Sequence, residues 1–413
     1  MLSPATPQAS VWKPEATKRL ALFFDGTWNL PGDNTNVWRL YLMIADQGAD
    51  GMRQLKYYNQ GVGTHWYDEL TGGAFGAGLP ENVRAGYRWL MENYNEGDEV
   101  FVFGFSRGAF TARGLIGLIA RCGLLKPDAP MSFMQLFERY QRGDAAAPIY
   151  DLKYFKKKPD AQMDFEERVL VNHAWYHPQM IKMVGVWDTV GSLGVPFGNI
   201  PGISRRTLSF INTNLSTVAA HSYQALALDE QRQPYWAVLW TTFEPVPPDL
   251  TAATRAQKCF IEQRWFAGAH ANVGGGYRSD LLPNRPLKWL YDKSVACGLG
   301  FRCTFEISDE DFGMKPVDSY AQFLDGFWKV MTLGKRYVRW VQADPKDKAK
   351  GRVRTVNERI DWSVFERWRM DATYRPASLL EWAGRKKLDI AAIIANPAQH
   401  SGLWEPVVKP GIE

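Results

Sequence analysis

Short apolar runs alternate along the chain with segments whose apolar residues recur at helical spacing. The runs that predict strands are Leu20–Phe24, Lys56–Asn59, Glu99–Phe103, Met183–Trp187, Tyr235–Trp240 and Phe260–Phe266. Helical spacing is found over Asn36–Asp46, Glu81–Tyr94 and Ala109–Ala120. Continuous apolar strands suit a sheet that helices cover on both faces. The alternation therefore predicts an α/β protein with a doubly wound, mostly parallel sheet.

Changes in composition divide the chain into parts. Residues 1–18 are rich in Pro, Ala, Ser and Thr and predict a flexible lead-in, so the core begins at Arg19 and extends over residues 19–300. An insertion is expected at about residues 126–180, where Lys, Asp and Pro are frequent. Residues 301–413 predict a Trp-rich, largely helical region that packs on the core as a cap, with helices over Tyr320–Gln342 and Ile360–Met370.

Composition and charge exclude several classes of protein. The 413 residues are 46% hydrophobic, which is enough for a large core. The 49 Lys and Arg against 44 Asp and Glu leave a net charge of +5, which is too small to indicate a nucleic-acid-binding protein. The four cysteines form no CxxC pair, so neither a disulfide framework nor a zinc site is expected. The N-terminus lacks a secretory signal pattern and no run is long enough to span a membrane. We expect a cytoplasmic protein, for which a signal-independent export route stays open.

Residues Gly104–Gly108 read Gly-Phe-Ser-Arg-Gly and fit the GxSxG pattern. In that pattern a serine occupies a strained turn between a strand and a helix, and the flanking glycines let backbone approach closely. The predicted strand before Gly104 and the predicted helix after Gly108 supply this context. Ser106 is therefore the expected nucleophile, in an α/β-hydrolase-like sheet.

A nucleophilic serine needs a histidine base and an orienting carboxylate, which in such sheets follow in the order Ser, Asp or Glu, His. Of six histidines, His221 and His270 remain after those before Ser106, in the insertion and near the C-terminal end are set aside. His270 is preferred because it follows the Phe260–Phe266 strand. Asp188, directly after Met183–Trp187, is the preferred acid, since ligand sites lie at the carboxyl ends of parallel strands. Asp229 is the rival acid, with pairing to Arg232 as its alternative role.

The oxyanion of an acyl-transfer intermediate needs backbone donors, and we expect the N–H groups of Arg107 and Thr27. Asp25-Gly26-Thr27 also resembles part of a phosphatase motif, but the nucleophilic Asp of that motif is replaced by Phe23. Asp33, Asn34 and Asn36 could approach a cation, although a turn-forming cluster is the preferred interpretation. The expected chemistry requires no metal and no organic cofactor.

Six short motifs together resemble one family of α/β-hydrolase domains. They are Phe24–Asn29, Asp33–Asn36, Gly61–Thr64, Gly104–Ala109, Gly185–Val190 and the His270 loop. This family also supplies the catalytic domain of type VI secretion phospholipase effectors. The resemblance implies a Ser-Asp-His lipase or esterase built on Ser106, Asp188 and His270. It also implies an aspartate at position 272, where this sequence has Asn272.

Two other functions stay open on the sequence: a soluble carboxylesterase or thioesterase, and a catalytically idle hydrolase fold that serves as a binding module. The expected partner is a lipid or a small ester. Lys335–Arg354 holds eight Lys and Arg beside aromatic residues and could contact a membrane surface peripherally, while a solvated charged loop is the simpler interpretation.

Overall fold

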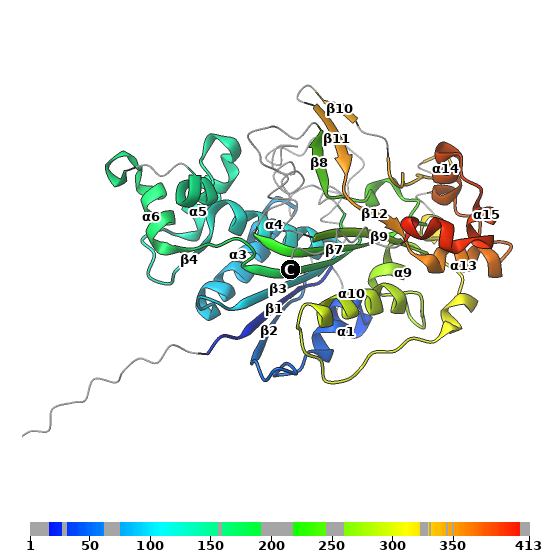
Figure 1. The fold of residues 1–413 in the computed structure, drawn as a ribbon, viewed down its shortest axis with the longest axis horizontal. Helices are drawn as coiled ribbons and strands as arrows, with labels where there is room; N and C mark the ends of the chain where they lie inside the picture. The colour runs from blue at the N-terminus through cyan, green and yellow to red at the C-terminus, as the bar shows by residue number, and fades with distance from the viewer. Residues whose placement is uncertain are drawn as a thin grey trace, which may run out of the picture.

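A seven-stranded parallel sheet forms the centre of the molecule in a computed structural model (Figure 1). The structure describes residues 16–26, 31–61, 75–155, 159–190, 218–244, 260–322, 329, 332–343, 346–348 and 351–404. The strands are β1 Arg19–Phe24, β2 Gln54–Asn59, β3 Glu99–Phe105, β6 Ile181–Trp187, β7 Ala219–Ala227, β9 Phe260–Phe266 and β12 Glu358–Ile360. Their order is β12-β9-β7-β6-β3-β1-β2, and every pairing is parallel. The predicted doubly wound α/β sheet is confirmed.

The apolar sequence of β1 follows from the helices on both faces of the sheet. Leu20, Leu22 and Phe24 point to one face, beside α3 (Phe75–Asn93) and α4 (Arg107–Cys122). Ala21 and Phe23 point to the other face, where α1 (Asn36–Met43) and α10 (Asn284–Ala296) pack. Figure 1 shows these two helical layers on opposite sides of the strands. Because successive side chains alternate between two buried faces, an unpaired polar residue at any position of Leu20–Phe24 would be costly.

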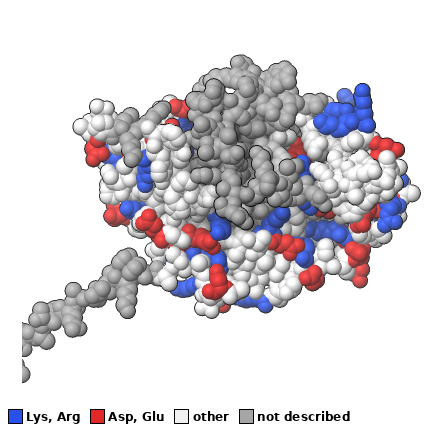
Figure 2. Space-filling view, viewed as in Figure 1, with Lys and Arg blue, Asp and Glu red and all other residues white. Residues whose placement is uncertain are grey.

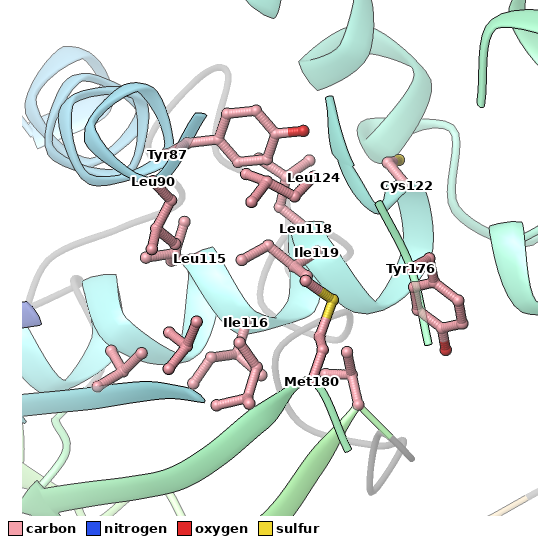
Figure 3. Packing of buried hydrophobic residues seen from close by; sticks show 14 of the residues in the cluster. Tyr87, Leu90, Leu115, Ile116, Leu118, Ile119, Cys122, Leu124, Tyr176 and Met180 are labelled. Atoms are coloured by element: carbon pink, nitrogen blue, oxygen red, sulfur yellow. The ribbon is translucent and has the colours of Figure 1, made fainter. Parts of the chain in front are cut away.

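The first layer is held by aliphatic contacts between α3 and α4. Figure 3 shows Tyr87 and Leu90 of α3 facing Leu115 and Ile119 of α4, with Leu124 beyond them. Tyr87 is fully buried, and its hydroxyl donates to the Gly123 carbonyl at 2.9 Å. Among the described residues, Cys122, Cys297 and Cys303 are free thiols.

The region expected as an insertion forms a helical lobe after α4 that packs on the same apolar cluster as α3 and α4. A two-stranded antiparallel ribbon of β4 (Leu124–Leu125) and β5 (Ala174–Trp175) brackets it. Between these strands lie α5 (Phe133–Gln141), α6 (Phe165–His173) and short turns at Gly143–Ala145, Asp151–Phe155 and Asp160–Gln162. In Figure 1 this lobe lies at the end of the molecule opposite to α13, α14 and α15.

The C-terminal region contributes to the sheet as well as covering it. β12 pairs with β9 and extends the sheet by one strand. Around it α13 (Trp362–Met370), α14 (Ala377–Lys386) and α15 (Ile390–Ala395) bury a third apolar cluster that includes Trp265 and Trp382. A small antiparallel sheet joins β8 (Thr241–Glu244), β11 (Gly351–Thr355) and β10 (Lys346–Lys348).

Two expectations about elements are wrong, and strand β7 was not predicted. Tyr235–Trp240 is not a strand, because a 3-10 turn over Gln233–Tyr235 contains Pro234 and overlaps its start, and only Ala237 makes an isolated bridge. The strand at this place in the sheet is β7, whose sequence Ala-Ala-His-Ser-Tyr-Gln-Ala-Leu-Ala lacks an apolar run. The long helix expected over Tyr320–Gln342 does not reach its expected end, since residues 332–343 form turns and chain without regular secondary structure; within the expected range, α11 (Ser319–Gln322) and Lys329 are helical.

Charged side chains of both signs lie interspersed over the described surface in the view of Figure 2. This distribution matches the small net charge of +5.

Candidate active site

Ser106 occupies a strained turn between β3 and α4. Its backbone has φ 59° and ψ −122°, a left-handed conformation that a serine adopts only when its surroundings impose it. The flanking glycines are required by packing. A Cβ on Gly104 would lie 2.5 Å from the Gly108 carbonyl oxygen, and a Cβ on Gly108 would lie 2.1 Å from the Phe24 carbonyl oxygen. The turn therefore holds the serine hydroxyl at the carboxyl end of β3.

The register of the sheet brings three loops to the same edge. Phe105 of β3 pairs with Trp187 of β6, and Trp187 pairs with Ala225 of β7. Ser106 and Asp188 directly follow the first two of these residues. His270 begins the short helix α9 (His270–Gly274) after β9, which runs beside β7. Residues far apart in the sequence thus meet where parallel strands end.

The side chains of Ser106, His270 and Asp188 form a continuous hydrogen-bonded row. His270 Nε2 lies 2.8 Å from Ser106 Oγ, and His270 Nδ1 lies 2.5 Å from Asp188 Oδ2. Ser106, His270 and Asp188 are all buried, with 8%, 6% and 0% of their surface exposed. A hydroxyl, an imidazole and a carboxylate in this order can transfer a proton away from the hydroxyl during nucleophilic attack.

Charges around the row favour an ionised acid and a neutral base. Burial raises the pKa of Asp188, but the Arg339 guanidinium and the His270 hydrogen bond outweigh burial and bring this pKa to about 2. Burial lowers the pKa of His270 below its ordinary value of 6.5, although the bond to Asp188 opposes the shift. At neutral pH the imidazole is therefore uncharged. Because Asp188 accepts from Nδ1–H, Nε2 is left to accept the Ser106 proton.

Arg339 binds Asp188 from the C-terminal region, and the sequence analysis did not single it out. Its Nη1 donates to Asp188 Oδ1 at 2.6 Å, and its Nη2 donates to Asp188 Oδ2 at 3.0 Å. The pair is completely buried, with Arg339 1% exposed. The two residues are 151 positions apart, so no local motif links them.

A buried Glu230 anchors the start of α9. Its carboxylate accepts from Arg232 Nε at 2.8 Å, from Ser319 Oγ at 3.1 Å and from the His270 backbone N–H at 3.2 Å. The ring of Tyr235 meets the His270 ring edge-on at 5.1 Å between centroids, and the Arg232 guanidinium lies over the same tyrosine. The imidazole is thus fixed both by its backbone and by its ring.

The structure places both rival residues away from the row. His221 lies near the start of β7, paired with Met183 near the start of β6, at the opposite edge from Ser106. Asp229 Oδ2 accepts from the Gly268 N–H at 2.6 Å and from the Tyr374 hydroxyl at 3.0 Å. The expected alternative of an Asp229–Arg232 pair is wrong, because Arg232 pairs with Glu230.

Comparison with known families identifies the chain. Residues 18–293 match the family described as "T6SS, Phospholipase effector Tle1-like, catalytic domain". The chain belongs to this Tle1-like family. The match covers the sheet from β1 to β9, together with the Ser106, Asp188 and His270 positions. The resemblance predicted from the short motifs is confirmed.

Individual proteins and solved structures are similar to this Tle1-like chain at low sequence identity. The uncharacterized protein YEL023C of Saccharomyces cerevisiae is 27% identical over 254 residues, which cover 56% of this chain and about a third (34%) of the yeast protein. An uncharacterized protein from Pseudomonas aeruginosa has a TM-score of 0.42 at 14% identity over 95% of this chain and 65% of its own. A Tle1 effector solved bound to the VgrG spike has a TM-score of 0.31 at 18% identity, covering 68% of this chain and 57% of that one. A Thermogutta terrifontis esterase has a TM-score of 0.31 at 12% identity, covering 71% and 89%.

Asn272 stands where the Tle1-like motif implies Asp, and it holds the α9 loop. Its Oδ1 accepts from the Ala269 N–H at 2.9 Å and from the Val317 N–H at 3.1 Å. A carboxylate oxygen would accept these two bonds equally well. The substitution therefore preserves the acceptor that closes the loop around His270.

The remaining predicted site residues divide into described and undescribed ones. Thr27 lies outside the described residues. Arg107 is the first residue of α4, directly after Ser106. In the Asp33, Asn34 and Asn36 cluster, the amide of Asn36 donates to the Val273 and Pro283 carbonyls, each at 2.9 Å, and ties α1 to α9 and to the start of α10. Among the described residues, no group of three or more His, Cys, Asp or Glu side chains is arranged to hold a metal ion.

Two cations in the described part of the basic segment Lys335–Arg354 are paired with acids. Arg339 is buried against Asp188, and Arg336 pairs with Asp318 at 2.7 Å. The side chains of residues 344–354 lie outside the described part. Within the described residues of this Tle1-like chain, no helix has the length and apolar character needed to cross a membrane.

Proposed function

We propose that this chain hydrolyses carboxylic ester bonds of lipids, with Ser106 as nucleophile, His270 as general base and Asp188 as the acid that orients it. The observation that carries the proposal is the buried row in which Ser106 Oγ, His270 and Asp188 are linked at 2.8 Å and 2.5 Å on a strained turn. Membership of a phospholipase effector family supports a lipid substrate.

The reaction proceeds in two acyl transfers. Ser106 Oγ attacks the ester carbonyl carbon while His270 Nε2 takes the hydroxyl proton. The tetrahedral intermediate expels the alcohol, which receives that proton from His270, and the acyl group stays on Ser106. Water then attacks the acyl-enzyme with His270 again as base, and the fatty acid leaves. Asp188 remains ionised throughout, because its pKa of about 2 keeps it a carboxylate that stabilises the imidazolium.

Backbone donors for the oxyanion are proposed at Arg107 and Thr27. Arg107 follows the nucleophile at the first turn of α4, where helical N–H groups point outward and favour negative charge. The contact of Gly108 with the Phe24 carbonyl brings the end of β1 against this turn. The loop that begins there with Gly26 and Thr27 is therefore the natural source of the second donor.

Delivery out of the producing cell by type VI secretion is part of the proposal. It is supported by the description of the family as type VI secretion effectors.

The first experiment compares the wild type with Ser106→Ala on two substrates. These are p-nitrophenyl esters of increasing chain length and vesicles of mixed phospholipids, with nitrophenol and free fatty acid as readouts. Fatty acid release that is lost in Ser106→Ala would support the lipase. Cleavage of short esters alone would indicate a soluble carboxylesterase or thioesterase. No turnover, together with no labelling of Ser106 by a fluorophosphonate, would overturn the proposal in favour of a binding module.

A further inference from the structure

We infer that Arg339 is a positioning residue for the attack by Ser106 and that it acts through Asp188. The inference rests on the proposed function, because it concerns the same row of side chains. Arg339 lies beyond residues 18–293, so the part of the chain that matches the catalytic-domain family does not contain the complete site.

Arg339 holds the Asp188 carboxylate in a fixed plane. It donates to both carboxylate oxygens, at 2.6 Å and 3.0 Å, in the two-pronged geometry that a guanidinium forms with a carboxylate. The Ala227 N–H donates to Oδ1 at 3.0 Å, which leaves Oδ2 to meet His270. Without Arg339, the Ala227 N–H would be the only donor besides His270 among the contacts described for this carboxylate.

The guanidinium also links Asp188 to the chain that surrounds His270. Its Nη1 donates to the Ala227 carbonyl at 2.8 Å, and its Nη2 donates to the Tyr235 carbonyl. Tyr235 packs its ring against the His270 ring. Arg339 therefore fixes both partners of the Asp188–His270 hydrogen bond, the first directly and the second through Tyr235.

The segment that carries Arg339 is itself anchored on both sides. Before it, the Tyr337 N–H donates to the Gln231 carbonyl at 2.9 Å. After it, Val341 is completely buried in the third apolar cluster, and the Gln342 N–H donates to Glu358 Oε2 at 3.0 Å. Glu358 belongs to β12, so the C-terminal strand of the sheet helps to fix the position of Arg339 relative to Asp188.

Arg339 also sets how readily the Asp188–His270 pair binds a proton. Asp188 faces Arg339 and His270, while His270 faces Asp188, Glu230, Arg232 and Tyr235. A cation beside the carboxylate disfavours a proton on the pair. If Arg339 is replaced by a neutral residue, the Asp188–His270 pair stays protonated to a higher pH. His270 can then no longer act as a base over part of the neutral pH range.

The test follows the rate of Ser106 labelling by a fluorophosphonate between pH 5 and pH 9 in the full chain. This readout does not depend on which lipid is the substrate. The variants are Arg339→Gln, which removes the charge, and Arg339→Lys, which keeps the charge but cannot bridge both oxygens and both carbonyls. Arg336→Gln is the matched control, because Arg336 forms an exposed ion pair with Asp318 in the same segment. Ser106→Ala gives the background.

Arg339→Gln is expected to label at least about tenfold more slowly at neutral pH, with the acid limb of the profile moved to higher pH. Arg339→Lys is expected to label at an intermediate rate with the acid limb of the wild type, and Arg336→Gln should match the wild type in both respects. A slow Arg339→Gln variant with an unmoved acid limb would overturn the inference, since a merely structural role predicts that result.

Thermal unfolding followed by circular dichroism shows which variants fold. If Arg339→Gln does not fold, Arg339→Lys decides, because labelling at the wild-type rate would show that the two-pronged contact is dispensable. If the wild type itself is not labelled, the proposed function fails and this inference fails with it. If the wild type is labelled and the Arg339 variants match it at every pH, only the inference fails.

Discussion

The side-chain amide of Asn272 donates a 2.8 Å hydrogen bond to Asp280 Oδ2. Burial raises the pKa of Asp280, and this amide opposes the shift by stabilising the ionised carboxylate. A carboxylate at position 272 would place two acids against each other. The amide of Asn272 therefore suits its neighbour Asp280 better than an aspartate at position 272 would.

Asn272→Asp should destabilise the protein in a pH-dependent way. At low pH the new acid and Asp280 are both protonated in the folded and unfolded states, so little stability is lost. As the pH rises, the unfolded chain ionises both acids freely while the folded state resists the second charge. We expect a loss of about 1–3 kcal/mol at pH 8 and a smaller one at pH 5, measured by urea unfolding.

The double variant Asn272→Asp/Asp280→Asn is the control, because it exchanges the amide and the acid across the same 2.8 Å contact. It should recover most of the stability lost at pH 8. A single variant as stable as the wild type at pH 8 would contradict this account of the loop.

Substitution of the two candidate acids should separate their roles. Asp188→Asn is expected to lower kcat/KM for a p-nitrophenyl ester by about 10³–10⁴-fold, because the neutral amide cannot stabilise the imidazolium. Asp229→Asn should stay within about threefold of the wild type, since Asp229 contacts Gly268 and Tyr374 rather than the His270 ring. Equal losses in the two variants would contradict the assignment of Asp188.

The activity of the wild type should depend on the proton of His270. Burial lowers the pKa of this imidazole below 6.5, so the neutral base persists below the pH at which a free histidine takes up a proton. We expect kcat/KM to be constant near pH 7–8 and to fall on an acid limb whose midpoint lies below pH 6.5. The measurement is a pH profile with a soluble p-nitrophenyl ester. A midpoint above pH 6.5 would show that the carboxylates around His270 outweigh its burial.

Gly108 and Gly114 lie in the same helix and should respond oppositely to alanine. A Cβ on Gly108 would lie 2.1 Å from the Phe24 carbonyl oxygen and 2.5 Å from that of Asp25. These are backbone atoms of a central strand, so Gly108→Ala should cost at least about 3 kcal/mol or prevent folding. A Cβ on Gly114 would meet only Val83 Cγ2 at 3.4 Å, an ordinary contact.

Gly114→Ala should therefore gain up to about 1 kcal/mol, as alanine favours a helix interior more than glycine does. Thermal unfolding of the two variants checks the contrast. A folded Gly108→Ala variant with wild-type stability would mean that β1 and α4 can separate without cost.

The strands that could be predicted are those buried on both faces. Leu20–Phe24 of β1 and Val100–Phe103 of β3 read as continuous apolar runs because apolar clusters cover both sides of them. β7 could not be found this way, since Gln224 is completely buried in it and donates to Gln263 Oε1 and to the Val238 carbonyl. A polar residue with buried partners is indistinguishable in the sequence from an exposed one. Tyr235–Trp240 was wrongly predicted as a strand because it is rich in aromatic and apolar residues. In the structure the Tyr235 ring packs against the His270 ring, and the Trp240 N–H donates to Gln263 Oε1.

The site residues divide in the same way. Ser106 carries a local signature, because the turn itself requires Gly104 and Gly108. Asp188 and His270 could be placed by the rule that ligand sites follow the ends of parallel strands. Arg339 has no such rule, since it lies in a segment without regular secondary structure outside the sheet, and its contact with Asp188 depends on how the C-terminal region folds back.

The pairing of β12 with β9 sets a late step in the synthesis of the chain. A ribosome must make residues 358–360 before the outer edge of β9 can be covered, although β9 itself ends at residue 266. Until then the edge of β9 offers unpaired N–H and C=O groups to any other nascent strand. The growing polypeptide is thus most exposed to aggregation after its family-matched part has left the ribosome and before the last strand joins the sheet.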